Sequence, residues 1–445
     1  VAQSGGSTAV AETGTTDTFT VVLNAQPASN VVISISSGDT GEATVSGSLT
    51  FTSVNWNSAQ TVTVTGVDDV TVDGAQTSTV TVSIIDAISD NDFDAVADQT
   101  VSVSTADNDT AGFTVTQSGG STSVDESGTT DTFTVVLNAQ PTSNVVLTVT
   151  SSDTGEATVN SPLTFTPANW DTPQTVTVTG VNDGSVVDGN QTSTVTVSVN
   201  DGSSNDSFDP LADQTVSVTT TDNDVPGFTV AESGGSTSVN ESGTTDTFTV
   251  VLNAQPTSDV LFSLTASDAT EASVTTSLTF TPANWNTAQT ATVTGLNEST
   301  VDGDQTSVIT ISIVDAVSND SFDPVADQTV SVTTVDNDTA GFTVVQSGGS
   351  TSVSEAGTTD TFTVVLNAQP ISDVVLTITS SDTGEATVNS PLTFTAGNWN
   401  SAQTVTVTGI DDNIIDGTIT STITIAVDDA NSDNNFDPVA NQTVS

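Results

Sequence analysis

Apolar and polar residues alternate along most of the chain. Phe133, Val135 and Leu137 occupy every second position, and a run such as Val195 to Val199 repeats the pattern. A period of two is typical of strands with one buried face. Thr and Ser fill most of the outward positions, and clusters of Gly, Asn, Asp and Pro separate the runs. Because no stretch has helical periodicity, the pattern predicts an all-β protein.

The same pattern repeats along the sequence. Trp56, Trp170, Trp285 and Trp399 lie 114 or 115 residues apart, and the one extra residue falls in segment 184–187. An insertion there is typical of a loop. About seven or eight short strands in each repeat would suit an immunoglobulin-like β-sandwich. We therefore predict a tandem array of such domains forming a rod or fibril, with domains at 1–109, 110–224, 225–338 and 339–445.

Both ends of the chain fall inside predicted strands. Val1 matches Val115 in the next repeat, and Ser445 matches Ser331 in the preceding one. We therefore expect the first and last domains to be cut, and the chain to be a window on a longer array. Any signal peptide, anchor or binding tip would then lie outside it.

The composition excludes several functions. The 445 residues contain 55 Asp and Glu and no Lys, Arg, His, Cys, Met or Tyr, which gives a net charge of −55. Without cationic side chains, nucleic acids and anionic membrane surfaces are excluded as partners, and no apolar run is long enough for membrane insertion. A Ser nucleophile would lack an activating base, and a carboxylate dyad needs one deep cleft. We expect no enzymatic activity.

Acidic residues recur at three places in each repeat. A Glu follows the opening strand, one or two acidic residues follow the strand after the Trp, and an Asp-Asn-Asp run closes the repeat. Without Cys and His, only oxygen ligands are left, and these favour calcium or magnesium. If the sandwich brings the three places to one end, they offer enough oxygens for the six to eight ligands of calcium.

These motifs resemble those of the Calx-β domain. The shared features are Glu12-Thr-Gly, Leu49-Thr-Phe-Thr, the run Val62-Thr-Val-Thr-Gly-Val-Asp-Asp and the closing Asp107-Asn-Asp. That family is an immunoglobulin-like sandwich found in the sodium–calcium exchanger and in tandem in large bacterial surface proteins. The resemblance implies a location outside the cell or on its surface, a bacterial source, and calcium at the end of each sandwich.

The resemblance also assigns the calcium ligands. Asn182 and Asn297 replace the first Asp of the paired position, so the middle repeats carry less charge there. The implied ligands are Glu12, Asp68, Asp69, Asp73, Asp107 and Asp109 in the first repeat, Glu126, Asp183, Asp188, Asp222 and Asp224 in the second, Glu241, Glu298, Asp302, Asp336 and Asp338 in the third, and Glu355, Asp411, Asp412 and Asp416 in the fourth.

Other residues have simpler interpretations. The acidic loops could serve only as solvated turns, where Asp and Asn are common. In the loop 90–98 we expect Phe93 to plug the core and Asp94 to cap a turn, rather than to form a calcium loop. Glu42 and its counterparts stand alone, so we expect them to be solvated or turn-bonded. The Trp residues are predicted to pack against the core and not to stack on sugars.

Taken together, these features favour a structural role. We predict a stalk or fibril-forming segment of a surface or adhesin-type protein, stiffened by calcium at the domain junctions. Its partners would be neighbouring repeats and other copies in a fibril, with glycans possible at triplets such as Asn190-Gln-Thr and Asn441-Gln-Thr. The alternative is a module that binds a ligand or glycan in adhesion, or a calcium-regulated sensor.

Overall fold

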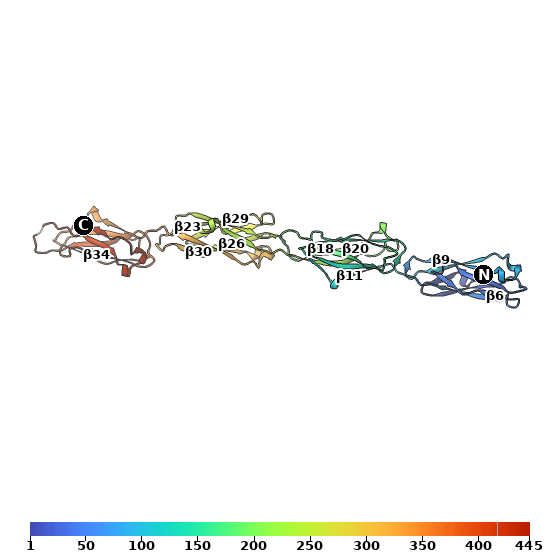
Figure 1. The fold of residues 1–445 in the computed structure, drawn as a ribbon. Coiled ribbons are helices and arrows are strands. Elements are labelled where there is room, and N and C mark those ends of the chain that lie inside the picture. The colour runs from blue at the N-terminus through green and yellow to red at the C-terminus, as the bar shows by residue number, and fades with distance from the viewer. Residues whose placement is uncertain (416) are drawn as a thin grey trace. The chain divides into compact units, whose positions relative to one another are not determined.

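The computed structural model describes residues 1–415 and 417–445. They divide into two compact units, 1–184 with 189–223, and 185–188 with 224–445. In the described part, strands alternate with loops and with three-residue 3₁₀ turns (Figure 1). No helix among these residues has the length and apolarity needed to cross a bilayer. The 3₁₀ turns are Ser4–Gly6, Asp86–Ile88, Asn91–Phe93, Ser118–Gly120, Asp201–Ser203, Ser233–Gly235, Asp315–Val317, Asp320–Phe322, Ser347–Gly349, Asp429–Asn431 and Asn434–Phe436.

Two sheets form the first repeat. One has the strand order β1-β3-β7-β5, and the other has the order β2-β10-β9-β4-β6. β1-β3-β7-β5 and β10-β9-β4 follow the order of the ABED and GFC sheets of an immunoglobulin domain. The prediction of immunoglobulin-like sandwiches is confirmed. The strands are β1 (Ala2–Gln3), β2 (Thr8–Ala11), β3 (Thr16–Val21), β4 (Val31–Ser37), β5 (Ala43–Val45), β6 (Leu49–Phe51), β7 (Gln60–Gly66), β9 (Gln76–Ile84) and β10 (Gln99–Ala106).

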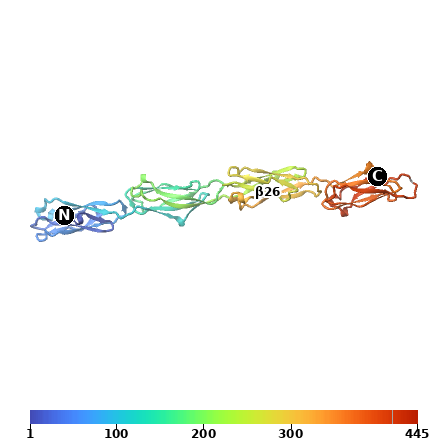
Figure 2. The ribbon, with the colours of Figure 1, turned by 180° about the vertical axis from the view of Figure 1, so that it is seen from behind.

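The second and third repeats have the same two sheets. Their orders are β11-β13-β18-β16 with β12-β21-β20-β15-β17, and β22-β24-β29-β27 with β23-β31-β30-β26-β28. In Figure 2, which shows the ribbon from behind, β26 marks the third repeat. The strands are β11 (Phe113–Gln117), β12 (Thr122–Asp125), β13 (Thr130–Leu137), β15 (Val145–Ser151), β16 (Ala157–Val159), β17 (Leu163–Phe165), β18 (Gln174–Gly180), β20 (Gln191–Val199) and β21 (Gln214–Thr221), then β22 (Phe228–Glu232), β23 (Thr237–Asn240), β24 (Thr245–Leu252), β26 (Val260–Ala266), β27 (Ala272–Val274), β28 (Ser277–Phe280), β29 (Gln289–Gly295), β30 (Gln305–Ile313) and β31 (Gln328–Val335).

The sequence ends within the final strand of the fourth repeat. Its sheets are β32-β33-β37-β35 and β36-β34-β38-β39, and β39 covers three residues where β10 covers eight. Among the described residues, no strand precedes Glu355 as β2 precedes Glu12. The strands are β32 (Phe342–Gln346), β33 (Thr359–Leu366), β34 (Val374–Ser380), β35 (Ala386–Val388), β36 (Leu392–Phe394), β37 (Gln403–Gly409), β38 (Ile423–Val427) and β39 (Gln442–Val444).

Each repeat has its own hydrophobic core. In the first, Phe19 and Phe51 are fully buried between the sheets, together with inward Val residues at every second strand position. Trp56 packs against the edge of this core, as Trp170, Trp285 and Trp399 do in theirs, so the predicted packing role of the Trp is confirmed.

A close approach of two backbones ties the end of β2 to the end of β7. A Cβ on Gly66 would lie 2.1 Å from the carbonyl oxygen of Ala11, a distance at which only glycine fits. Glu12 follows Ala11 directly, and the connection from β7 to β9 (residues 67–75) follows Gly66. We call this connection and its counterparts the junction loop. The glycine therefore brings Glu12 and the junction loop together.

The junction loop also reaches the following repeat. In the first unit, β8 (Thr71–Val72) pairs in parallel with β14 (Gln140–Pro141), and Val72 joins the core of the second repeat. In the second unit, β19 (Val186–Val187) pairs in the same way with β25 (Gln255–Pro256), and Val187 joins the third core. Val301 likewise joins the fourth core.

Candidate metal centre

Glu12 lies at the centre of the acidic cluster in the first repeat. Its side chain is only 1% exposed, and its carboxylate accepts a hydrogen bond from the backbone N–H of Asn108 at 3.1 Å. Its own N–H donates to the carbonyl of Ala106 at 3.1 Å. The opening strand and the Asp-Asn-Asp run are therefore joined at this residue.

Asp107 joins the same run to the junction loop. Its carboxylate accepts hydrogen bonds from the N–H groups of Asp73 at 3.1 Å, Gly74 at 2.8 Å and Asp109 at 2.6 Å. Gly74 has a positive φ of 72°, which the turn toward Asp107 requires and which favours glycine. Three acidic segments that are distant in sequence thus meet at one end of the sandwich, as predicted.

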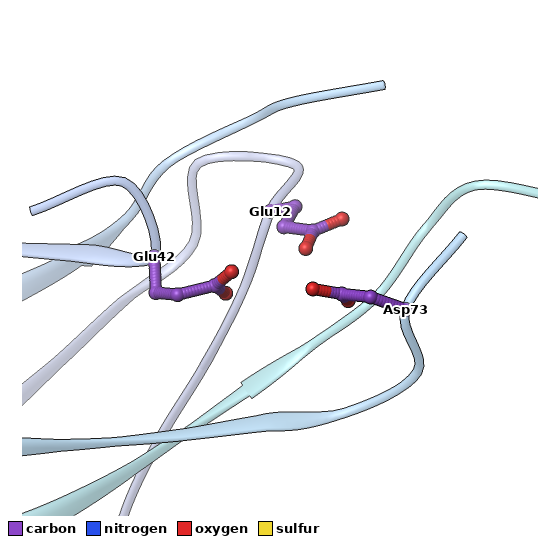
Figure 3. Close-up of side chains that lie close together, drawn as sticks. All are labelled: Glu12, Glu42 and Asp73. Atoms are coloured by element: carbon purple, nitrogen blue, oxygen red, sulfur yellow. The ribbon is translucent and has the colours of Figure 1, made fainter. Parts of the chain in front are cut away.

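Glu42 is the residue that the sequence analysis missed. The expectation that it is solvated is wrong, because its side chain is only 8% exposed and points toward Glu12 and Asp73 (Figure 3). The ligand oxygens of these three residues lie within 4.8 Å of one another. The feature that could have indicated the burial of Glu42 is its position directly before the fully buried Ala43, at the start of β5.

A second group of oxygens shares Glu12. Its members are Glu12, Asp107 and Asp109, again within 4.8 Å of one another. Glu42, Asp73 and Asp109 each have one buried oxygen without a hydrogen-bond donor. A buried carboxylate oxygen without a donor or cation is costly. The donor set is entirely oxygen and carries several negative charges, which fits a hard divalent cation.

Burial and mutual repulsion change the proton affinity of these carboxyls. Burial raises the pKa of Glu12, Glu42, Asp73 and Asp109, and neighbouring carboxylates add to the increase. For Glu42 the pKa reaches about 7. A hydrogen bond from Asn108 partly offsets the effect at Glu12. Raised pKa values in a cluster mean that the metal-free site gains from a bound proton or cation.

Asp68 and Asp69 lie beside these groups. Asp68 is exposed and accepts a hydrogen bond from the side-chain amide of Asn108 at 2.8 Å. Asp69 accepts from the N–H of Thr71 at 2.7 Å, and its charge contributes to the raised pKa of Glu42 and Asp73. Asp69 is therefore near the cluster. Asp68 holds Asn108 of the Asp-Asn-Asp run, and its charge adds to the raised pKa of Asp109.

The third repeat, in the second unit, forms a similar cluster, in which Glu298 of the junction loop takes part. Glu241, Glu298 and Asp302 place oxygens within 4.8 Å of one another. Asp336 accepts from the N–H groups of Gly303 and Asp338, as Asp107 does in the first repeat. Burial raises the pKa of Glu241, Asp302 and Asp338, and that of Glu271, the counterpart of Glu42, to about 7.

In the second repeat, the predicted residues are divided between the two units. Glu126, Asp183 and Asp222 belong to the first unit, and Asp188 and Asp224 belong to the second. Within the first unit, Glu126 is 1% exposed and accepts from the N–H of Asn223 at 3.3 Å. Asp222 accepts from the N–H of Gly189 at 2.8 Å.

In the fourth repeat the sequence ends at Ser445, before the position of the closing Asp-Asn-Asp run, so only part of the arrangement is present. Glu355 is half-buried and lines a cavity of about 710 Å³ with Glu385, the counterpart of Glu42. Asp411 is exposed, and Asp412 accepts from the N–H of Ile414 at 2.7 Å. Asp416 lies outside the described residues.

The acidic loop before the last strand has the predicted core plug. Phe208, Phe322 and Phe436 are fully buried, whereas Phe93 is half-buried. Asp94 lies at the C-terminal cap of the turn, where its backbone N–H donates to the carbonyl of Asn91 at 3.3 Å. The side chain that caps the turn at its N-terminal end is that of Asp90, which accepts from the N–H of Asp92 at 3.2 Å and from those of Ala28 and Ser29. These hydrogen bonds hold the pKa of Asp90 below its usual range.

Comparisons with known proteins give fold similarity alone. No protein-family model matches the chain, and neither does any curated protein. Among solved structures, a titin I-band fragment is 11% identical over 74% of this chain and 95% of its own, with a TM-score of 0.27. The CBD12 fragment of CALX1.2 is 13% identical over 44% and 79%, with a TM-score of 0.20, and the human desmocollin-1 ectodomain is 9% identical over 98% and 76%, with a TM-score of 0.25. Scores this low support no conclusion about function.

The fold and the site define a class of protein. The chain is a tandem array of immunoglobulin-like β-sandwich repeats. Buried carboxylates meet at one end of the first sandwich, and the third repeat forms an equivalent group.

Proposed function

We propose that the chain is a structural spacer in an extracellular stalk or fibril, and that calcium bound at the junction loops stiffens it. The domains would be those predicted, with boundaries after residues 109, 224 and 338. The ligands would be the residues assigned above, together with Glu42, Glu156, Glu271 and Glu385. The sequence has no His or Lys to activate a Ser nucleophile and no Cys thiol, which supports a passive role over nucleophilic catalysis.

One observation carries the proposal. The junction loop holds Asp69 and Asp73 next to the buried oxygens, and between them it holds Val72, which packs into the core of the next repeat. A cation that fixes Asp73 would therefore also fix the segment that contacts the neighbouring domain. Without the cation, mutual repulsion of the buried carboxylates would loosen both.

The ligand chemistry favours calcium over magnesium. Calcium accepts six to eight oxygens in irregular geometry, whereas magnesium demands tighter octahedral geometry and retains its water. We expect a weak affinity, on the order of 10⁻⁴ to 10⁻³ M, as in other extracellular modules. Such an affinity would suit a calcium-rich exterior, and we propose a location on a bacterial cell surface.

The remaining partners follow from the same role. Neighbouring repeats of the chain and other copies in a fibril would be the main contacts. Glycans at exposed Asn-x-Ser or Asn-x-Thr triplets would shield the strand edges. Intact mass measurement of material from the native source tests this: a mass equal to that of the bare polypeptide would contradict the presence of glycans.

Isothermal titration calorimetry tests the calcium site itself. The purified chain, stripped with chelator, should bind calcium with an endothermic or exothermic saturable signal at more than one site per chain. Magnesium at the same concentration should give a much smaller response. Absence of saturable calcium binding up to several millimolar would contradict the proposal.

A further inference from the structure

A strand near the start of each of the first three repeats runs parallel to the last strand of the same repeat. In the third repeat, β23 pairs in parallel with β31, from Thr237 opposite Val332 to Asn240 opposite Val335. In the first two repeats, β2 pairs in the same way with β10, and β12 with β21. This ladder of backbone hydrogen bonds links the part of the chain that enters a repeat to the part that leaves it.

The ladder continues past the end of β23. The N–H of Glu241 donates to the carbonyl of Val335 at 3.3 Å, and its carboxylate accepts from the N–H of Asn337 at 3.1 Å. Glu12 and Glu126 make the same two contacts in the first and second repeats. A side chain therefore lengthens the ladder where the chain leaves each of these repeats.

The N–H groups of β23 differ in what they contact. The N–H of Ser238 donates to the carboxylate of Asp246 at 3.0 Å, on the side away from β31, whereas the N–H of Glu241 donates to Val335 at the end of β31. Successive N–H groups of a strand point to opposite sides, so the N–H of Val239 also faces β31. Val239 thus belongs to the ladder, and the N–H of Ser238 does not.

The chain enters and leaves the third repeat at opposite ends. Phe228, at the start of β22, pairs with Leu252 at the end of β24, and the side-chain amide of Gln328 at the start of β31 donates to the carbonyl of Phe228 at 2.7 Å. The other end of β24 pairs with the end of β29, where a Cβ on Gly295 would lie 2.1 Å from the carbonyl oxygen of Asn240. The eight residues of β24 separate these ends by roughly 24 Å. Tension on the two ends of the repeat therefore acts along β23 and β31.

We propose that this ladder is a load-bearing clamp, with which the repeats resist tension applied through the chain. Such tension draws the start of β23 and the end of β31 apart along the strands, so all hydrogen bonds of the ladder are loaded together in shear. If the strands were peeled apart from one end, the bonds would break one after another at a lower force. The clamp would keep each domain folded while a stalk or fibril is pulled. This inference rests on the spacer role proposed above, but it does not depend on bound calcium.

Single-molecule force spectroscopy of the whole chain in chelator tests the clamp. The sequence has no Cys, so two introduced thiols can carry the handles. Val225→Cys with Thr339→Cys pulls the third repeat from end to end, whereas Val225→Cys with Asp327→Cys pulls at the starts of β22 and β31. All three residues are exposed and lie outside the strands.

The first pair of handles should require a severalfold higher unfolding force than the second, because only the first loads the ladder in shear. Equal unfolding forces for the two pairs would overturn the proposal. No calcium is present in this measurement, so a failure of calcium binding would contradict the function proposed above without changing the result here.

Two proline variants test which hydrogen bonds carry the load. Val239→Pro removes an N–H that faces β31, and Ser238→Pro is the matched control, because it removes an N–H that faces Asp246. With the end-to-end handles, Val239→Pro should lower the unfolding force by about a third or more, and Ser238→Pro should lower it much less. Equal losses of force would overturn the proposal. Circular dichroism verifies that both variants are folded, and the comparison of handles, which leaves β23 unchanged, decides the proposal when a proline variant fails to fold.

Discussion

Glu42 and Asp73 face one another at the end of the first sandwich, and each has a buried oxygen that accepts no hydrogen bond (Figure 3). Glu42 comes directly before β5, and Asp73 lies in the junction loop between β7 and β9. The pair therefore brings the start of β5 next to the loop that connects the two sheets. Such a pair is unfavourable without a cation and favourable with one.

Replacing Glu42 by Gln should have opposite effects with and without calcium. In chelator at neutral pH, the variant should melt at a higher temperature than the wild type, because one buried charge is removed. In calcium, it should gain less stability, and the affinity of its site should fall by about tenfold or more, since ligand charge sets calcium affinity. Differential scanning calorimetry and calcium titration measure the two effects.

Asp98→Asn is the matched control for that change. Asp98 is exposed and lies in the loop before β10, so the substitution removes the same charge without altering the cluster. It should leave both quantities unchanged. Equal effects of Glu42→Gln and Asp98→Asn would mean that only net charge matters.

The stability of the metal-free protein should decrease as the pH rises. Burial raises the pKa of Glu42 and Glu271 from 4.5 to about 7, so the folded state holds protons that the unfolded state releases. Their contribution is fully present below pH 4.5 and is lost as the pH rises through about 7. The melting temperature in chelator should therefore be lower at about pH 8 than at about pH 5.

Calcium should stabilise the protein more at high pH than at low pH, because protons compete with calcium for the carboxylates. The difference in melting temperature between calcium and chelator should widen from about pH 5 to about pH 8. The double variant Glu42→Gln with Glu271→Gln should flatten the metal-free profile. A wild-type melting temperature in chelator that increases over this interval would be the opposite of what the buried carboxyls predict.

Gly66→Ala should damage both the fold and the site of the first repeat. The added Cβ would lie 2.1 Å from the carbonyl oxygen of Ala11, so the backbones must separate at a cost of about 1–3 kcal/mol. Because Glu12 follows Ala11, calcium binding by this repeat should weaken as well. Gly47→Ala, with no atom within 4 Å of the new Cβ, is the control and should change stability by less than about 0.5 kcal/mol. Equal melting curves for the two variants would exclude the proposed steric role.

Val72→Ser should loosen the contact between the first two repeats. The backbone N–H of Gln140 is bonded across that contact, so its hydrogen exchange should accelerate by about tenfold or more, as expected for a loss of about 1.4 kcal/mol. Exchange measured by mass spectrometry on the peptide that contains Gln140 tests this. Val54→Ser is the control, because Val54 is 88% exposed and outside the contact. Unchanged exchange in Val72→Ser would show that the Val does not stabilise the junction.

The sequence predicts the sandwiches well because strands and repeats are specified by patterns of residues close together in the sequence. Alternation at Phe133, Val135 and Leu137 specifies a strand face, and the spacing of the Trp residues specifies the repeat. The meeting of Glu12, Asp73 and Asp107 was also predictable, since each follows or precedes a strand end.

Two features depend on long-range packing and were not predicted. Glu42 stands alone in the sequence, and only the close approach of β5 to the junction loop buries it. Val72 looks like a loop residue, and only the next repeat supplies its surroundings. An apolar residue at the same place in every acidic junction loop is the signal that could have indicated this contact.

Small-angle X-ray scattering of the chain in calcium and in chelator is the most direct test of the central claim. If calcium fixes the junction loops, the protein in calcium should have a larger maximum dimension and a narrower range of conformations than in chelator. Magnesium should restore little of the difference, and the melting temperature should change in parallel. The same maximum dimension and the same melting temperature in calcium and in chelator would contradict the account.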